Sequence, residues 1–397
     1  MIKQYAYKFQ LRPTDQQAKT MSQFAGCNRL VWNKALALQK ERLDKKQFVF
    51  KYTELADQLI QWKKELPFLA QTHSQTYQQT LKNLDRALKE AFNKKNPKQF
   101  PVFKKKGLKD SFKYPQGFKV NQERSEIYLP KIGWVKYRNS REIQGTVKNV
   151  IVAKNCNKWY VAVQVEIEVA KPQHQSTSIV GVDVGISKFA TCSDGKIYQP
   201  VNSFRNHEKR LVFLQRGLSR KKKFSRNWKK QKEKIQKVHS KIVRIRHDYL
   251  HKTTNEISKN HAVVILEDLK ISNMSKKAKE NNVKAKSGLN KSILDQGWYE
   301  FRRQLEYKLK WRGGELFLVN PQYTSQKCSK CGHVHADNRT SQAEFECVKC
   351  GHSENADINA SRNILVAGHA MFACGGCGIS QPMKHEPDRT AKLKSFA

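Results

Sequence analysis

Two Cys-x-x-Cys pairs near the end of the chain place the strongest constraint on its fold. They are Cys328-Ser-Lys-Cys331 and Cys347-Val-Lys-Cys350, with 15 residues between them. Two hairpin-like turns at this spacing present four thiolates in the tetrahedral arrangement that structural zinc requires. Gly332 and Gly351, each directly after a pair, suit the tight turn. We therefore expect one closed zinc site that stabilises a small insert and performs no chemistry.

We assign no zinc-binding role to the other potential ligands near these two pairs. His333, His335 and His352 are close in sequence, but four thiolates leave them no coordination position. A further pair, Cys374-Gly-Gly-Cys377, has no partner pair and sits in a glycine-rich tail. We interpret these two cysteines as ordinary thiols.

The charge of the chain indicates a polyanionic partner. Its 397 residues include 76 Lys and Arg against 34 Asp and Glu, which gives a net charge of +42. A field of this size favours nucleic acid over a small metabolite. No apolar run reaches the roughly 18 residues of a membrane span, and the first ten residues alternate too regularly for a signal peptide. We expect a cytoplasmic protein without a membrane partner.

The first half of the chain reads as one strand, then helices, then further strands. Residues 1–10 alternate as a strand does, and Thr14 with Gln17 forms a capping box for a helix. Further helices are expected at 54–63 and 73–92. Proline and glycine punctuate the chain after Asn96, and strands are expected at 127–129, 134–137, 147–153 and 159–167. These strands suggest a small barrel that the first strand joins, followed by a linker at 171–178.

The second half reads as an α/β unit. Strands are expected at 179–184, 261–266 and 316–319, with hairpin strands at 188–191 and 196–198. One long basic helical stretch is expected over 206–258 and another helix over 291–311. A last helix is expected from Asp357, with irregular chain after about Gly368.

Three carboxylates lie at the ends of predicted strands or at the start of a predicted helix. Asp183 and Glu267 each end an apolar strand, and Asp357 opens the last helix. Carboxylates that converge on one spot repel each other, and divalent cations relieve the repulsion. Two such ions about 4 Å apart support phosphodiester cleavage. The pattern leaves two choices open, because Asp268 competes with Glu267 on the opposite strand face and Glu354 could replace Asp357.

Three further residues lie on or beside the same helix face as Asp357. They are Asn359, Arg362 and Asn363. Arg362 could steady the charge that develops on a phosphate during cleavage. The alternative for this arginine is a surface salt bridge.

Two basic stretches are the candidate nucleic-acid contacts. Residues 205–246 carry 17 Lys and Arg, too many for pairing within the helix. The densest cluster in this stretch is Arg216, Arg220, Lys221, Lys222 and Lys223. Residues 94–119 interleave nine lysines, among them Lys104, Lys105 and Lys106, with aromatic residues that suit stacking on bases. Buried barrel aromatics would explain the same rings.

Several longer motifs follow one another along the chain. In the second half they are Gly-Val-Asp-Val-Gly-Ile at 181–186, Leu-Glu-Asp-Leu at 266–269, Gly-Trp-Tyr-Glu-Phe-Arg-Arg-Gln-Leu-Glu-Tyr-Lys at 297–308, Cys-Ser-Lys-Cys-Gly at 328–332 and Asn-Ala-Asp-Ile-Asn-Ala-Ser-Arg-Asn-Ile at 355–364. In the first half they are Arg-Leu-Val-Trp-Asn at 29–33 and Pro-Lys-Ile-Gly-Trp-Val-Lys at 130–136. Together these motifs resemble the TnpB family, whose members are encoded by insertion sequences and are relatives of type V CRISPR effectors. The resemblance covers most of the chain.

The resemblance implies a multidomain α+β fold. An RNase H-like (RuvC) α/β nuclease domain would occupy 173–321 and 354–370, with a four-cysteine zinc ribbon inserted at 322–353. A wedge β-barrel at 1–13 and 96–172 would be interrupted by a helical recognition unit at 14–95, and 371–397 would be a flexible tail. By motif position the resemblance selects Asp183, Glu267 and Asp357 as ligands of two Mg²⁺ ions. This choice prefers Glu267 to Asp268.

The resemblance also implies an RNA-guided DNA endonuclease. Its partners would be a guide RNA derived from the transposon end and a double-stranded DNA target, with base pairing rather than the protein specifying the target. A monomer bound to its RNA is expected. Ser74, Gln75 and Gln78 are candidate contacts to a short adjacent motif in the duplex, against the alternative of exposed helix polar residues. The competing functions are a nuclease-dead RNA-guided repressor and a transposase that catalyses strand transfer.

Overall fold

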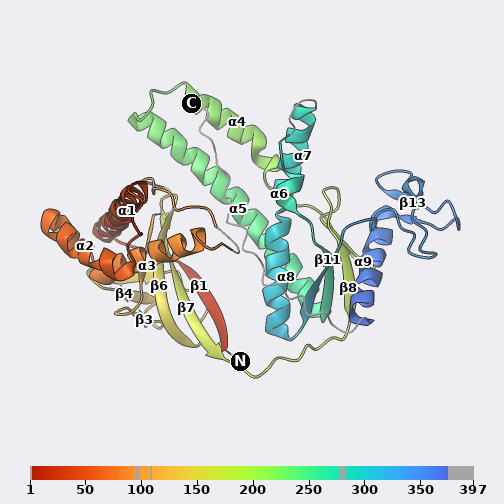
Figure 1. Ribbon diagram of the computed structural model, residues 1–397, viewed down its shortest axis with the longest axis horizontal. Coiled ribbons are helices and arrows are strands. Elements are labelled where there is room, and N and C mark those ends of the chain that lie inside the picture. The colour runs from red at the N-terminus through yellow and green to blue at the C-terminus, as the bar shows by residue number, and fades with distance from the viewer. Residues whose placement is uncertain (1, 95–97, 108–109, 278–281, 374–397) are drawn as a thin grey trace. The chain divides into compact units, whose positions relative to one another are not determined.

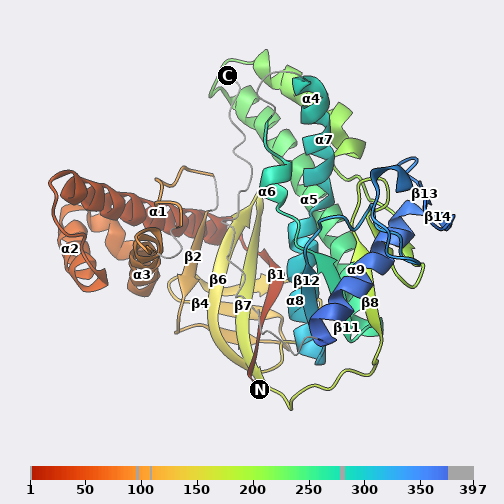
Figure 2. The same ribbon diagram turned by 45° about the vertical axis from the view of Figure 1, so that its right-hand side comes forward.

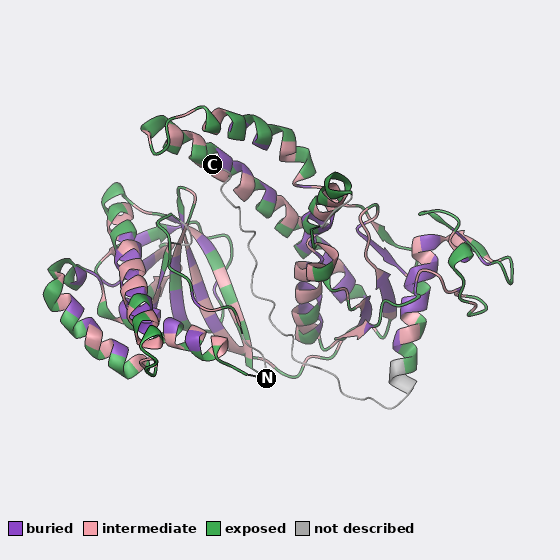
Figure 3. Ribbon diagram, turned by 45° about the horizontal axis from the view of Figure 1, so that its top comes forward, coloured by how far each residue is buried: buried purple, intermediate pink, exposed green. Residues whose placement is uncertain are grey.

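A computed structural model describes residues 2–94, 98–107, 110–277 and 282–373 of the chain (Figure 1). Contacts divide the chain into a first unit that ends at Val169 and a second that begins at Ala170. Each unit has its own sheet and its own buried core, and buried residues concentrate along the strands (Figure 3). Cys374 and Cys377 lie outside the described residues.

The first unit contains a seven-stranded antiparallel sheet. The strands are β1 (Ile2–Arg12), β2 (Ser111–Tyr114), β3 (Lys119–Asn121), β4 (Glu126–Leu129), β5 (Gly133–Tyr137), β6 (Thr146–Asn155) and β7 (Lys158–Glu168). Their order is β2-β6-β7-β1-β5-β4-β3. Strand β1 pairs with β7 along most of its length and with β5 near its end. The prediction that the N-terminal strand joins the later strands is therefore confirmed.

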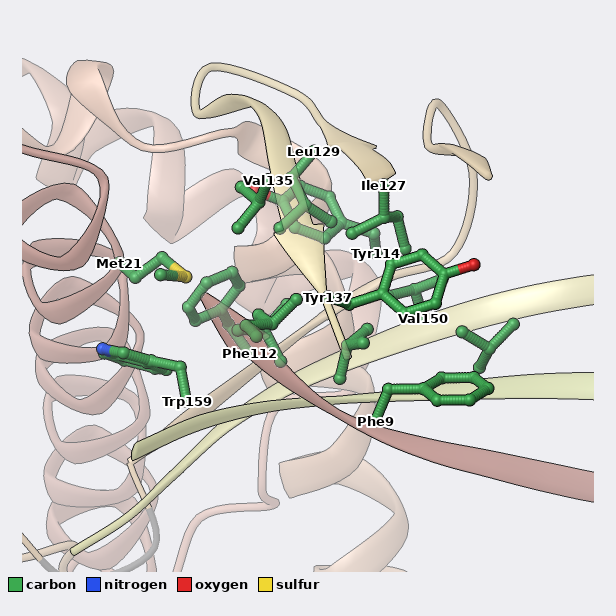
Figure 4. Close-up of a cluster of buried hydrophobic side chains, with 14 of the residues drawn as sticks. Phe9, Met21, Phe112, Tyr114, Ile127, Leu129, Val135, Tyr137, Val150 and Trp159 are labelled. Carbon is green, nitrogen blue, oxygen red and sulfur yellow. The ribbon is translucent and has the colours of Figure 1, made fainter. Parts of the chain in front are cut away.

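One apolar cluster holds this sheet together (Figure 4). Phe9 from β1 packs its ring 5.0 Å from that of Tyr137, measured between centroids, and Phe112 lies 5.7 Å from Phe24 of the first helix. All four side chains are buried. Alternate residues of each strand therefore face the same core, as the period-two pattern predicts.

Three helices form a second cluster in the first unit. They are α1 (Asp15–Asp44), α2 (Tyr52–Glu65) and α3 (Ser74–Ala91), with a short 3₁₀ turn, η1 (Pro67–Gln71), before α3. The capping box of α1 is formed as predicted, because Thr14 Oγ1 accepts from the Gln17 amide and Gln17 Oε1 accepts from the Thr14 amide. The helices expected at 54–63 and 73–92 are likewise confirmed.

The second unit contains a five-stranded sheet in the order β10-β9-β8-β11-β12. Its strands are β8 (Ile179–Asp183), β9 (Ala190–Cys192), β10 (Ile197–Tyr198), β11 (Val263–Glu267) and β12 (Glu315–Val319). Strand β11 pairs in parallel with β8 and β12, whereas β9 and β10 form an antiparallel hairpin at one edge. The strands expected from the sequence are all present.

Helices cover both faces of this second sheet (Figure 2). Val264 and Leu266 of β11 face α5 (Arg226–Asn260) and α8 (Trp298–Arg312), while Ile265 faces α9 (Ala356–Ala373). Two glycines let α9 lie close to the strands. A Cβ on Gly181 would meet the Ser361 carbonyl at 2.2 Å, and one on Gly368 would meet Ile265 Cδ1 at 2.1 Å.

Two predicted helices are wrong in extent, because each is two helices. The basic stretch 206–258 divides into α4 (Arg205–Ser219) and α5, which meet at a turn where Phe224 has φ +68° and Ser225 caps the next helix through the Trp228 amide. The stretch 291–311 belongs to α7 (Val283–Gln296) and α8, which are separated by Gly297 at φ +73°. Gly297 ends α7 because a left-handed backbone cannot continue the spiral, whereas α4 ends at Ser219 with right-handed Arg220 as its C-cap, before Phe224 is reached.

The remaining elements belong to short segments. Helix α6 (Ile271–Met274) follows β11, and an insert between β12 and α9 contains η2 (Ala336–Asn338), β13 (Glu344–Glu346) and β14 (Ser353–Asn355). Helix α9 continues to Ala373, past the position where irregular chain was expected. Within the described residues, no helix combines the length and apolar character needed to cross a bilayer.

Candidate active site

The register of the parallel strands brings Asp183 and Glu267 to one edge of the second sheet. Val182 of β8 pairs with Leu266 of β11, so the residue that follows each of them lies at the same carboxyl end. Both strands are apolar up to that point and buried. The sheet therefore delivers two carboxylates to the edge where sites of open α/β sheets form.

Helix α9 brings the third carboxylate to the same region. Asp357 lies in its first turn, and the Asp357 amide donates to Asn355 Oδ1 at 3.2 Å. The close approach permitted by Gly181 places this helix directly on β8. The arrangement joins three segments that are 84 and 90 residues apart in the sequence.

The electrostatics show that Glu267 and Asp357 are close enough to Asp183 to affect its pKa. Burial, together with the neighbouring negative charges of Glu267 and Asp357, raises the pKa of Asp183 to about 7. Burial also raises the pKa of Glu267, while a hydrogen bond from Thr324 lowers it. A carboxylate with a raised pKa is held in an environment that disfavours its negative charge.

Two basic residues, neither of which the sequence singled out, act on this cluster. Lys188 Nζ lies 3.3 Å from Asp357 Oδ2 and donates to Asn355 Oδ1 at 2.9 Å. Arg339, in the insert, lowers the pKa of Asp183 through its positive charge. The available sequence signal for Lys188 was its position as a basic residue shortly after Asp183. Nothing in the spacing of the insert identified Arg339.

The competing carboxylates are engaged elsewhere. Asp268 is half-exposed and forms an ion pair with Arg302 at 2.7 Å. Glu354 forms an ion pair with Arg362 at 2.7 Å. Arg362 therefore makes a salt bridge of the kind that was its alternative interpretation, and its action on phosphate stays a prediction. The choice of Glu267 and Asp357 as metal ligands likewise stays a prediction, although these residues, unlike their competitors, act on Asp183.

The chemistry of this carboxylate cluster suits a hard divalent cation, although within the described residues it is the four cysteines, and not these carboxylates, whose ligand atoms all lie within 4.8 Å of one another. Its donors are carboxylate oxygens from three elements, which is the ligand type that Mg²⁺ prefers in proteins. The raised pKa of Asp183 reflects a concentration of negative charge in a buried place. A bound cation would remove the cost of ionising these groups together.

The four cysteines of the insert form a compact cluster. The Sγ atoms of Cys328, Cys331, Cys347 and Cys350 all lie within 4.8 Å of one another. The separations Cys328–Cys350 and Cys331–Cys347 are 3.7 and 3.6 Å. Four sulfurs at about 2.3 Å from a zinc ion would be ~3.8 Å apart. The cluster can therefore hold a metal such as zinc.

The backbone of each pair forms the same turn. The Cys328 amide donates to the His333 carbonyl, and the Cys347 amide donates to the His352 carbonyl. Gly332 and Gly351, each in the left-handed conformation, donate back to the first cysteine of their pair. The predicted role of the two glycines is thus confirmed.

Two asparagines anchor this insert to helix α9. Asn359 Oδ1 accepts from the Ser329 amide at 2.9 Å, and Asn359 Nδ2 donates to the Lys327 carbonyl at 2.8 Å. Asn363 Nδ2 donates to the carbonyls of Thr324 and Lys327. Both asparagines are buried, so the insert is fixed against the helix that carries Asp357.

The candidate nucleic-acid residues of the second unit lie at the turn between α4 and α5. Arg216 lies in the last turn of α4, and Arg220 is its C-cap. Lys222 and Lys223 are exposed in the turn that follows, beside the exposed ring of Phe224. Lys221, in the same turn, is half-buried. Arg216 also lines an open hollow along α4 together with Lys209 and Phe213.

The candidate residues of the first unit have mixed environments. Lys104, Lys105 and Lys106 are all exposed as whole residues, but Lys104 Nζ lies 3.8 Å from the centroid of the Trp32 ring, where desolvation of the ammonium group lowers its pKa to about 8. Ser74 Oγ accepts from Lys63 Nζ at 2.9 Å. Within the described residues, Gln75 Oε1 is buried without a hydrogen-bond partner, and Gln78 is exposed. Their contacts with nucleic acid stay predictions.

Three protein families match separate parts of the chain. A family described as "Probable transposase" matches residues 162–278, one described as "Cas12f1-like, TNB domain" matches 298–364, and one described as "Helix-turn-helix domain" matches 1–47. In the structure, the last of these stretches contains strand β1 and the single long helix α1.

Curated relatives extend the similarity to the full chain. The protein of Escherichia coli (strain K12) named "Putative RNA-guided DNA endonuclease InsQ" is 54% identical over 96% of this chain and 97% of its own length. A protein of Streptomyces pristinaespiralis with the same functional description is 34% identical over 93% and 90%. Among solved structures, a Cas12f1 complex with guide RNA and target DNA matches with a TM-score of 0.50, at 16% identity, over 92% of this chain and 98% of that one. This last likeness concerns the fold.

Proposed function

The chain belongs to the TnpB family of RNA-guided DNA endonucleases, and from that membership we propose that it cleaves target DNA under the direction of a guide RNA. The observation that carries the proposal is the meeting of Asp183, Glu267 and Asp357, from two adjacent strands and a helix, where the pKa of Asp183 is raised to about 7. A nuclease-dead protein would have no use for a carboxylate whose pKa is raised by burial and by two neighbouring acids.

In this proposal the three carboxylates hold two Mg²⁺ ions. When bound, Mg²⁺ supplies Lewis-acid activation of the attacking water and stabilises charge on the leaving 3′-oxygen. The chain contributes the orientation of the carboxylates, through the strand register and the packing of α9. Lys188 and Arg339 contribute positive charge that offsets part of the carboxylate repulsion. The four-cysteine cluster would hold zinc and keep the insert folded against α9.

The partners follow from the charge and the family. We propose that the chain binds a guide RNA from the transposon end as a monomer, together with a double-stranded DNA target, in the prokaryotic cytoplasm. The basic turn between α4 and α5, the lysines at 104–106 and the polar residues at the start of α3 are the proposed contacts. The proposed domains are those that the family resemblance implies, with a barrel-like first unit and a RuvC-like second unit.

The test is a cleavage assay with purified protein and the RNA that copurifies with it. Sequencing that RNA gives the guide, from which a matched, labelled plasmid is made. We expect Mg²⁺-dependent cleavage that requires both the RNA and the matched sequence. Joined DNA products in the absence of RNA would indicate a strand-transfer transposase instead. Guided binding without cleavage would indicate a repressor.

A further inference from the structure

The hydroxyl group of Thr324 makes a short hydrogen bond to one of the three carboxylates. Thr324 Oγ1 donates to Glu267 Oε1 at 2.5 Å, and Thr324 is buried. Thr324 lies five residues beyond the end of β12 and four residues before Cys328, so it belongs to the chain that leads into the cysteine insert. The insert therefore touches the candidate active site directly.

Thr324 is held in place by helix α9. Its carbonyl accepts from Asn363 Nδ2 at 3.0 Å, and the same Nδ2 donates to the Lys327 carbonyl at 2.6 Å. Asn359, one turn earlier on α9, donates to the Lys327 carbonyl as well. These bonds fix the segment that contains Thr324 on the helix that begins beside Asp357.

The result is a connection between two carboxylates that come from different elements. Glu267 is fixed through the Thr324 hydroxyl, and Thr324 is fixed through the α9 asparagines. A glutamate side chain has three rotatable bonds, so strand register alone leaves the direction of its carboxylate undetermined. A hydrogen bond from a buried, anchored hydroxyl selects one direction. Groups that orient ligands in this way commonly determine metal affinity.

We propose that Thr324 is a positioning residue for divalent metal binding: its hydroxyl orients the Glu267 carboxylate, and Asn363 and Asn359 set that orientation relative to Asp357. The inference rests on the proposed function, because it takes the three acids as the metal ligands. It adds a residue outside the acid trio and gives the buried asparagines of α9 a purpose beyond anchoring the insert.

A purely local role for the hydroxyl is the competing explanation. Thr324 Oγ1 also lies 3.1 Å from the Pro321 carbonyl, and a hydroxyl has one hydrogen to donate. If the Thr324 hydroxyl donates its hydrogen to the Pro321 carbonyl, removing the hydroxyl would alter the fold of this segment and leave the metal site unchanged. The shorter distance, 2.5 Å, is to the charged acceptor, which favours Glu267 as the partner.

The test uses the full-length, zinc-loaded chain, freed of nucleic acid, and Mn²⁺ as the probe. Binding is followed by the loss of the electron paramagnetic resonance signal of free Mn²⁺, so no activity is needed. The variants are Thr324→Val, which keeps the shape without the hydroxyl, and Thr324→Ser, which keeps the hydroxyl. Thr340→Val is the matched control, because Thr340 is an exposed threonine of the same insert. Zinc content and melting temperature are measured for each.

We expect Thr324→Val to weaken Mn²⁺ binding by about 10- to 100-fold, the range typical of groups that orient metal ligands. Thr324→Ser should restore binding and Thr340→Val should leave it unchanged, with one zinc per chain throughout. Unchanged Mn²⁺ affinity in Thr324→Val would overturn the proposal, and so would equal losses in the Val and Ser variants. If Thr324→Val loses zinc or unfolds, Thr324→Ala against Thr324→Ser gives the same comparison.

A separate variant distinguishes failure of this inference from failure of the proposed function. Asp183→Ala should abolish Mn²⁺ binding at the site whatever Thr324 does. If Asp183→Ala binds Mn²⁺ as tightly as the unaltered chain, the acid trio is not the metal site. If Asp183→Ala loses Mn²⁺ binding and Thr324→Val does not, the three acids remain the metal site and the proposed positioning role of Thr324 is wrong.

Discussion

The ammonium group of Lys188 lies 3.3 Å from Oδ2 of Asp357, with both side chains mostly buried. In the part of the chain that the structure describes, Lys188 is the basic residue that forms an ion pair with the acid trio. It therefore supplies positive charge beside a carboxylate of the trio, and its contribution should be largest in the metal-free protein.

Replacing Lys188 with Met should lower the stability of the metal-free protein. Loss of the ion pair leaves Asp357 beside two other carboxylates, at a cost of about 1 kcal/mol, or ~2–4 °C in melting temperature. Mg²⁺ should reduce the difference, because it neutralises the same charges. Thermal unfolding with and without Mg²⁺ checks this, with Lys241→Met on the exposed face of α5 as the control. A loss that Mg²⁺ leaves unchanged would contradict the interpretation.

Glu267 and Asp268 provide a matched pair for testing the active site. Glu267→Gln should lower the cleavage rate by about 1,000-fold, since several kcal/mol of transition-state stabilisation is lost with a metal ligand. Asp268→Asn removes the neighbouring charge, which is paired with Arg302, and should leave the rate close to that of the unaltered protein. Rates are measured on the matched plasmid, with target binding as the folding control. Similar losses in both variants would reject the assignment.

The sequence predicted the parts of the site that depend on local pattern. Apolar runs identified β8 and β11, and cysteine spacing identified the cluster, because strand alternation and metal geometry both leave regular signals. Register did not choose between Glu267 and Asp268. That choice came from family motif position, and in the structure Asp268 pairs with Arg302.

The residues that sequence reasoning missed act across the fold. Lys188, Arg339 and Thr324 are, respectively, 169, 156 and 57 residues from the carboxylate that each affects. Their roles depend on which surfaces pack together, and no short-range pattern records that. The same reason explains the two divided helices. A helical pattern continues across both breaks, and at Gly297 the break depends on a single left-handed residue.

Asp183 should make the metal-free protein less stable as the pH rises. Its pKa is raised to about 7 from an ordinary value near 3.8, so the folded state holds a proton that the unfolded state has lost between about pH 4 and 7. Stability therefore falls with rising pH across this window, and the full cost of the buried charge is present above about pH 7. Asp183→Asn should raise the metal-free melting temperature at pH 8 and have little effect at pH 4. A stabilisation that is equal at both pH values would contradict this.

Removal of zinc should loosen the insert and the start of α9 together. Cys347→Ser removes one thiolate of the cluster, and Asn359 and Asn363 transmit the loss to the helix that carries Asp357. We expect loss of bound zinc, a lower melting temperature and loss of cleavage. Cys156→Ser, at the turn between β6 and β7, is the control and should retain one zinc per chain. Normal cleavage by a zinc-free Cys347→Ser protein would show that the insert does not support the site.

Lys222 and Lys223 should contribute to nucleic-acid affinity in a way that depends on salt. Each phosphate contact that is lost reduces the slope of log affinity against log salt by ~0.7–0.9, so Lys222→Gln with Lys223→Gln should reduce it by up to about 1.8. Lys104→Gln is the contrasting variant, because its ammonium group lies on the Trp32 ring and its pKa is lowered to about 8. We expect that change to lower thermal stability and to alter the slope less. RNA-binding titrations from 50 to about 300 mM salt measure the slopes. An unchanged slope in the double variant would place the α4–α5 turn outside the RNA interface.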